Sequence, residues 1–166
     1  MAARTSRPIV LPLSNPTANS EATPLDVLSW TECRAVVATG SPFDPVEFAG
    51  QTHVIGQANN VFIFPGVGLG AVASRAWEVT DKMFLVAAET LANMVPSERI
   101  EQGAMYPRLT ALRSISRAIA VAVAKEASGK VAPQASDDEI EAMVDACIWE
   151  PRYENAGQHR DWAPDD

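Results

Sequence analysis

The sequence predicts an α/β fold with a few parallel strands, a small β-hairpin and a largely helical C-terminal region. Three observations support this prediction. A strand, a helix and a second strand follow one another between residues 7 and 39, and strands joined in this way are parallel. A hairpin pattern with glycine in its turn occupies residues 46–55. From residue 67 onward, apolar residues recur with helical spacing.

The first strand is expected at Arg7–Leu13, which reads RPIVLPL and has the continuous apolar character of a buried strand. Pro12 has no N–H group to donate, so it restricts pairing to one end of this strand. A turn follows at Ser14-Asn15-Pro16-Thr17.

A helix is then expected from Thr23 to about Cys33. Thr23 can cap the first turn, and Pro24 suits the first helical position. The second strand, Arg34–Thr39, follows this helix and ends at a Gly-Ser-Pro sequence.

The hairpin is expected to pair Val46–Phe48 with Gln51–Ile55. Helices are expected next at about Val67–Arg75, Thr80–Met94 and Arg108–Ala127. The last of these is apolar on almost every side, which is typical of a helix buried on several sides.

The final helix begins at a capping box, Ser136–Glu139, and ends before Pro151. Its apolar residues form one stripe, which we expect to be buried against this chain or a sister subunit: Ile140, Met143, Val144, Cys147 and Ile148.

Two parallel strands cannot cover the edges and faces of their own sheet. We therefore expect the chain to form the second half of a larger sheet. A partner chain or the rest of a longer protein would supply the first half.

The composition argues against a nucleic-acid partner, because the net charge is −8 and the basic residues are scattered. The longest apolar run, at 118–124, is too short to cross a membrane. Cys33 and Cys147 are expected to be buried free thiols of a cytoplasmic protein.

The stretch Gly66–Ala71 reads GVGLGA and fits the dinucleotide fingerprint G-x-G-x-x-G/A. Val61–Phe64 could be the strand that such a fingerprint requires. A second helix follows the motif, however, where the fingerprint needs a strand with an acidic end. The sequence favours glycines that allow close helix packing or close approach of a ligand.

Three amides are candidate binding residues. Asn15 follows the first parallel strand, at the edge where open α/β sheets bind ligands. Asn59 and Asn60 lie beside the apolar sequence VFIF. An amide suits a nicotinamide carboxamide or a substrate carboxylate. The residues alone favour a turn over a binding role at Asn15, and at Asn59 and Asn60 the alternative to a binding role is a helix cap or a loop turn.

No complete catalytic set is expected in this chain. Lys82, Lys125 and Lys130 have polar surroundings, and Ser41 has no evident histidine base. Tyr106 lies in a connector. No spacing of acidic, histidine or cysteine residues predicts a metal site.

Several motifs together resemble the malic enzyme family. They are SNPT at 14–17, EATP at 21–24, ATGSPFDPVEF at 38–48, GQANNVFIFPGVGLG at 56–70 and VTDKMFLVAAE at 79–89. The resemblance covers nearly the whole chain. It implies the C-terminal half of a Rossmann-like NAD(P)-binding domain at residues 7–130, after a leader at 1–6. A C-terminal packing helix at 131–151 and a polar tail at 152–166 would follow.

The family oxidatively decarboxylates L-malate to pyruvate and CO2, with reduction of NAD or NADP and with Mg2+ or Mn2+. The resemblance implies that Asn15 and Asn59 lie beside malate and the nicotinamide ring, with Asn60 nearby. It places the pyrophosphate fingerprint upstream of SNPT, so that GVGLGA would begin a helix on the active-site side. It also implies a homo-oligomer.

The family's tyrosine acid, lysine base, metal ligands and substrate arginine all precede SNPT. We therefore expect the chain alone to be inactive, with the metal bound by residues outside it. Two alternatives remain open. One is a non-catalytic remnant or interaction module that pairs with another chain through its incomplete sheet. The other is a free-standing nucleotide-binding domain that uses GVGLGA.

Overall fold

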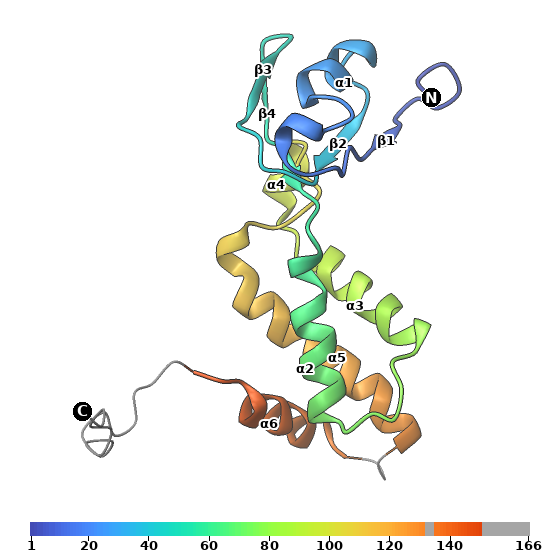
Figure 1. Ribbon diagram of the computed structural model, residues 1–166, viewed down its shortest axis with the longest axis vertical. Coiled ribbons are helices and arrows are strands. Elements are labelled where there is room, and N and C mark those ends of the chain that lie inside the picture. The colour runs from blue at the N-terminus through green and yellow to red at the C-terminus, as the bar shows by residue number, and fades with distance from the viewer. Residues whose placement is uncertain (132–134, 151–166) are drawn as a thin grey trace, which may run out of the picture.

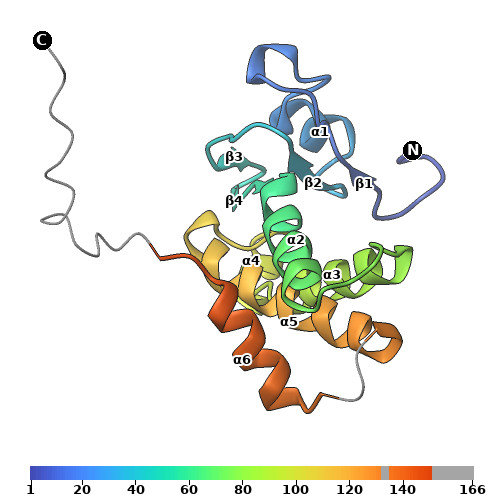
Figure 2. The same cartoon turned by 60° about the horizontal axis from the view of Figure 1, so that its bottom comes forward.

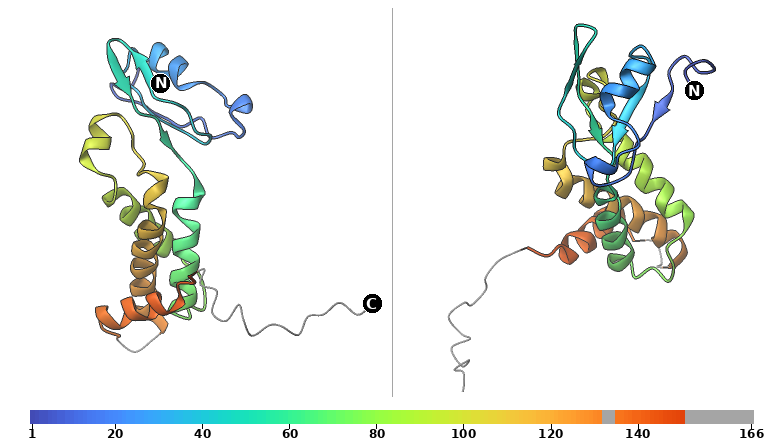
Figure 3. Two further views of the ribbon diagram at one scale, coloured as in Figure 1. Left: turned by 90° about the vertical axis from the view of Figure 1, so that its left-hand side faces the viewer. Right: turned by 45° about the horizontal axis from the view of Figure 1, so that its top comes forward.

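The computed structural model describes residues 1–131 and 135–150. The elements form a sheet region, residues 1–59, and a helical region from residue 60 onward. The sheet region and most of the helical region are stacked along the long axis of the molecule, whereas the short helix α4 (Ser97–Glu101) lies beside the strands (Figure 1). Figure 3 shows that the chain passes from the sheet region into the helical region at the start of helix α2 (Phe64–Ala73).

The main sheet contains three parallel strands in the order β1-β2-β5. Strand β1 (Ile9–Val10) pairs with β2 (Val36–Thr39), and β2 pairs with β5 (Gly56–Gln57). The predicted parallel pair is therefore confirmed. The expectation of only two parallel strands is wrong, because the short β5 has no apolar run that would reveal it.

Pro8 and Pro12 explain why β1 is so short. Their carbonyl oxygens accept hydrogen bonds from Val36 N, at 2.9 Å, and from Gly40 N, at 3.0 Å. The backbones of both prolines therefore face β2, yet neither proline has an N–H group that could donate a hydrogen bond to that strand. The ladder with β2 is regular only between them, as the position of Pro12 predicted.

Helix α1 (Pro24–Trp30) begins at the predicted cap. Thr23 Oγ1 accepts the N–H of Asp26, and the Asp26 carboxylate accepts the N–H of Thr23. The helix ends before Cys33, because the backbone turns through positive φ values of 53° at Glu32 and 59° at Cys33. A short 3-10 helix, η1 (Thr17–Asn19), precedes α1.

The predicted hairpin is confirmed as β3 (Val46–Phe48) and β4 (Gln51–His53), with Ala49 and Gly50 in its turn at positive φ. The hairpin and α1 pack beside the sheet. Their shared core consists of Val27, Leu28, Ala35 and Val37, with Val46 and Phe48 packed against it.

The helical region contains a 3-10 helix η2 (Asn60–Phe62) and the helices α2 (Phe64–Ala73) and α3 (Asp81–Asn93). Next come a short helix α4 (Ser97–Glu101), a 3-10 helix η3 (Leu109–Ala111), the long α5 (Leu112–Val131) and α6 (Asp137–Cys147). Helix α5 packs against α2, α3 and α6 (Figure 2). The stretch Val61–Phe64 is thus no strand, and α4 was not predicted.

Helix α5 passes through the two apolar cores of this region. One core joins α5 to α2, α3 and η2, and includes Phe62, Met83, Ile115, Ile119 and Val123. The other joins α5 to α2 and α6, and includes Ala73, Ala120, Ala124, Ile140 and Val144. The buried character predicted for this helix is therefore confirmed.

Two of the three glycines in GVGLG allow α2 to approach α5. A Cβ atom on Gly66 would lie 2.6 Å from the Ile119 side chain, and one on Gly70 would lie 2.6 Å from the Ala120 carbonyl oxygen. Gly68 faces open space. Close packing therefore explains Gly66 and Gly70 but gives no reason for Gly68.

Helix α6 has the predicted capping box at Ser136 and Glu139. Only part of its predicted stripe is buried within the chain. Ile140 and Val144 are buried, whereas Met143 and Cys147 are exposed and Ile148 is partly buried. The prediction of buried thiols is therefore wrong for Cys147, because α6 packs on α5 and α2 along one narrow side. Cys33 is partly buried.

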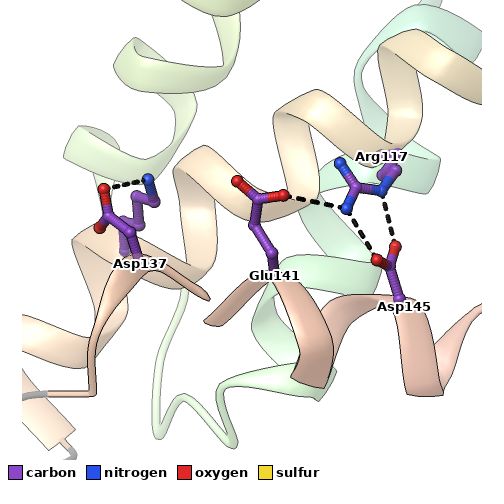
Figure 4. A network of polar contacts seen from close by, with 5 residues as sticks. Arg117, Asp137, Glu141 and Asp145 are labelled. Carbon is purple, nitrogen blue, oxygen red and sulfur yellow. Dashed lines mark hydrogen bonds and ion pairs between the residues drawn. The ribbon is translucent and has the colours of Figure 1, made fainter. Parts of the chain in front are cut away.

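Three acidic residues of α6, Asp137, Glu141 and Asp145, form ion pairs with α5 (Figure 4). Arg117 Nε lies 2.6 Å from Asp145 Oδ1, and Arg117 Nη2 lies 3.1 Å from Glu141 Oε2. Lys125 Nζ lies 2.8 Å from Asp137 Oδ2. Hydrogen bonding to Arg117 holds the pKa of Asp145 below its usual value.

Candidate active site at the end of the sheet

A cavity of about 450 Å³ lies where the carboxyl end of the sheet meets the helical region. The segment after β1, the loop before α2, helix α3 and the segment before η3 form its wall. Its lining is mainly apolar and includes Leu11, Leu13, Asn59, Asn60, Leu91 and Tyr106. Concave sites of this size at the carboxyl ends of parallel strands are typical of small-ligand binding.

Asn59 both lines this cavity and caps η2. Its Oδ1 accepts the N–H of Val61 at 2.9 Å, so the cap that the residues alone suggested is real. The preceding backbone is held to the sheet, because the Ala58 N–H donates to the Thr39 carbonyl at 2.8 Å. The Asn59 oxygen thus spends one of its two lone pairs on the cap, and its NH2 group donates to no residue within 1–131 or 135–150.

Asn60 lines the same cavity and is exposed. Its side chain has no hydrogen bond to any residue within 1–131 or 135–150. Both the amide oxygen and the NH2 group can therefore meet a ligand. The structure thus brings two of the three predicted amides together in one cavity.

Asn15 is placed differently. It is exposed and is not among the residues that line the cavity. Its Oδ1 accepts a hydrogen bond of 2.5 Å from the Ser41 hydroxyl, which follows β2. Its Nδ2 makes only a long contact of 3.5 Å with the Leu13 carbonyl. Asn15 therefore belongs to the turn after β1, at the same sheet edge, with its NH2 group nearly free.

Two further contacts fix the chain around Asn15. The Ser14 hydroxyl donates to Glu21 Oε1 at 2.6 Å and closes the loop between β1 and α1. This hydrogen bond holds the pKa of Glu21 below its usual value. A Cβ atom at Gly40 would lie 2.1 Å from the Leu13 carbonyl oxygen, so only glycine fits where β2 passes this loop.

Sequence reasoning missed two residues at this edge. Ser41 was considered only as a nucleophile, and its role in orienting Asn15 has no signal in the local sequence. Tyr106 was assigned to a connector, yet it lines the cavity and stacks on Phe62 with ring centroids 6.0 Å apart. Its position one residue before a proline gave no indication of that contact.

GVGLGA does not form a phosphate-binding turn. Helix α2 begins at Phe64, before the first glycine of the motif, and a 3-10 helix rather than a strand precedes it. The glycines therefore lie inside the helix. The prediction of a helix at this point is confirmed, and the alternative of a free-standing nucleotide-binding domain based on GVGLGA is wrong.

The side chains at this edge can bind and orient a ligand, because they are amides and hydroxyls with free donors and acceptors. Residues 1–131 and 135–150 contain no group of three His, Cys, Asp or Glu side chains that could hold a metal ion. In the same residues, no helix is long and apolar enough to cross a membrane.

Comparison with known proteins agrees with this architecture. Residues 1–128 match the family described as malic enzyme, NAD binding domain. An NAD-dependent malic enzyme of Sodalis glossinidius is 48% identical over 148 residues, which are 89% of this chain and 26% of the relative. An NAD-dependent malic enzyme of Aeromonas hydrophila is 49% identical over 150 residues, again 89% and 26%.

An NAD-dependent malic enzyme 2 of Photobacterium profundum is 47% identical over 154 residues, which cover 92% of this chain and 28% of that protein. The chain thus spans about a quarter of the length of these curated relatives. The family match covers the sheet region and the helices up to α5. The chain therefore belongs to the malic enzyme family, with residues 1–128 corresponding to its NAD-binding domain.

Proposed function

We propose that this chain is the C-terminal part of the cofactor domain of an enzyme that oxidatively decarboxylates L-malate to pyruvate and CO2 while it reduces NAD+. The observation that supports this most is the placement of Asn59 and Asn60 in one cavity at the carboxyl end of the sheet. The names of the relatives favour NAD over NADP.

In this proposal the amides position the reactants. The NH2 group of Asn59 and the free amide of Asn60 donate hydrogen bonds to malate oxygens or to the nicotinamide carboxamide. Asn15, oriented by Ser41, does the same from the neighbouring turn. NAD+, when bound, would supply the acceptor for a hydride from the substrate carbon. The residues of this chain fix the distance and angle between the two reacting molecules.

The acid, the base and the ligands of Mg2+ or Mn2+ belong, in this proposal, to other parts of the enzyme. Among the described residues, the polar side chains that line the cavity are those of Asn59, Asn60 and Tyr106, and no group of three His, Cys, Asp or Glu side chains could hold a metal ion. The 166-residue chain alone should therefore give no malate-dependent reduction of NAD+ or NADP+, because proton transfer and polarisation of the substrate lack their groups.

The test assays two proteins with malate, Mn2+ and either cofactor: the 166-residue chain, and a longer protein in which the chain is joined to the preceding region of a relative. Turnover only in the longer protein supports the proposal. Turnover by the 166-residue chain would contradict the proposal that the acid, the base and the metal ligands lie outside it. A longer protein that folds but stays inactive would contradict a catalytic role for this chain.

The second candidate is a non-catalytic module that pairs with another chain. It is favoured by the open edge of β1, where Ile9 is 53%, Leu11 42% and Leu13 48% exposed. A sister subunit or the preceding part of the enzyme could cover these side chains. Light scattering of the chain with and without the preceding region tests this, since pairing would change its mass, and Leu11→Lys should weaken that pairing.

A further inference from the structure

Arg99 is the one charged residue buried within the described part of the chain, at 8% exposure. It lies in α4, and its Nε donates to the Tyr106 carbonyl oxygen at 3.0 Å. No carboxylate within residues 1–131 or 135–150 pairs with it. A buried guanidinium is costly without a counter-ion, and buried charges in proteins are normally paired.

The two Nη groups of Arg99 have no hydrogen-bond partner within residues 1–131 and 135–150, yet neither is sealed from solvent. The stem and Nε are therefore enclosed, while the end of the guanidinium remains accessible. This end carries the paired N–H groups that bind carboxylates and phosphates through two parallel hydrogen bonds. The bond from Nε to Tyr106 fixes the orientation of this group before a ligand arrives.

A second cation strengthens this site. Arg108 is exposed, lies just beyond Pro107 and has no ion pair within the described residues. Its charge acts on Arg99, whose pKa is lowered by burial and by Arg108. Two guanidinium charges that act on each other, neither in an ion pair within the described residues, favour a doubly charged anion over a singly charged one.

We propose that Arg99, assisted by Arg108, forms a binding site for a small dianionic oxyanion, such as a phosphate group or a dicarboxylate. The site adjoins the backbone of Tyr106, a residue that also lines the cavity of about 450 Å³. Its occupation would neutralise the one buried charge and hold the segment between α4 and η3. This inference does not depend on the proposed catalytic function.

Inorganic phosphate is the probe. The 166-residue chain is titrated with phosphate at constant ionic strength, and binding is followed by calorimetry and by the NMR signals of the arginine Nε–H groups. We expect saturable binding with a dissociation constant on the order of 1 mM, a shift of the Arg99 signal, and weaker binding of acetate.

Arg99→Gln should weaken phosphate binding about tenfold or more, and Arg108→Gln by a smaller factor. Arg113→Gln, an exposed arginine on α5, is the matched control and should bind as the parent does. If Arg99→Gln unfolds the chain, Arg99→Lys keeps the charge and should still weaken binding, because it loses the paired N–H groups. No saturable binding, or equal binding by the Arg99 variants and the parent, would overturn the proposal.

Discussion

The hydroxyl of Ser41 donates a 2.5 Å hydrogen bond to the side-chain oxygen of Asn15, and so joins the segments that follow the adjacent strands β2 and β1. Ser41 is buried and Asn15 is exposed, so the serine determines which end of the amide faces outward. The NH2 group of Asn15 is left with only a long contact of 3.5 Å to the Leu13 carbonyl oxygen.

In a complete enzyme, replacement of Ser41 by alanine should therefore lower the catalytic rate more than it lowers the stability of the fold. Loss of one neutral hydrogen bond costs about 0.5–1.5 kcal/mol in stability. A displaced amide can slow catalysis by roughly 100-fold if the reactants move by about 1 Å. The measurement is kcat/KM for malate beside Tm, with the exposed Ser29→Ala as control. Equal kcat/KM in Ser41→Ala and Ser29→Ala would show that Asn15 does not position a reactant.

Asn59 allows its two roles to be separated. Asn59→Asp keeps an oxygen that can accept the Val61 N–H, but it replaces the NH2 donor with a negative oxygen. We expect it to keep Tm and to lose most affinity for the anionic substrate. Asn59→Ala loses the cap as well, at a cost of about 1 kcal/mol. If Asn59→Asp binds malate normally, Asn59 is only a cap.

The glycines of α2 form a matched pair. Gly70→Ala would place a methyl group 2.6 Å from the Ala120 carbonyl oxygen, where only a shift of α5 could make room. We expect a loss of about 1–3 kcal/mol in the free energy of unfolding. Gly68→Ala meets no atom within 4 Å and should stabilise by up to about 1 kcal/mol through helix propensity. Chemical denaturation of both variants measures these opposite signs, and a destabilised Gly68→Ala would reveal a contact beyond the residues that the structure describes, in this chain or in another.

Substitution of two adjacent residues of α6 by aspartate should have very different effects on the stability of the chain. Val144 is fully buried, so Val144→Asp should destabilise by several kcal/mol because it places an unpaired charge in the core. Met143 is 38% exposed, and Met143→Asp should leave Tm of this chain nearly unchanged. A large fall in Tm for Met143→Asp would indicate that a second copy covers that side of the helix.

The bond between Arg117 and Asp145 should make α6 sensitive to acid. The pKa of Asp145 is lowered in the folded chain, so its contribution to stability is present above about pH 4, the ordinary range for Asp. That contribution is lost as the pH falls through the lower folded value. Asp145→Asn should therefore lower Tm at pH 7, and the difference from the parent should vanish in acid. Thermal melts of both proteins at pH 7 and in acid measure this difference, and hydrogen exchange of the α6 amides locates it. A difference in Tm that is as large in acid as at pH 7 would contradict the prediction.

Local signals predicted the fold well where they were strong. The capping residues Thr23 and Ser136 set the starts of α1 and α6, because each satisfies free N–H groups of the first turn. Strand β5 was missed because its pairing depends on β2 and not on its own two residues. The exposed side of α6 was missed because a regular apolar stripe does not reveal how wide the contacting surface is.

The site was predictable only in part. Asn59 and Asn60 were found through their family motif, and their shared cavity agrees with a binding role. The separate position of Asn15 and its bond to Ser41 depend on how two distant turns meet, which no short stretch of sequence records. Arg99 likewise resembles any surface arginine until the folded chain encloses it.

The prolines that shorten β1 also have a consequence for producing this chain. Pro8 and Pro12 face β2, so by the alternation of a strand the backbone groups of Ile9 and Leu11 face the other way, uninterrupted by proline. An open edge with apolar side chains is a template for aggregation. Expressed by itself, the chain should tend toward insoluble material. Co-expression with a segment that supplies the neighbouring strand should restore soluble protein.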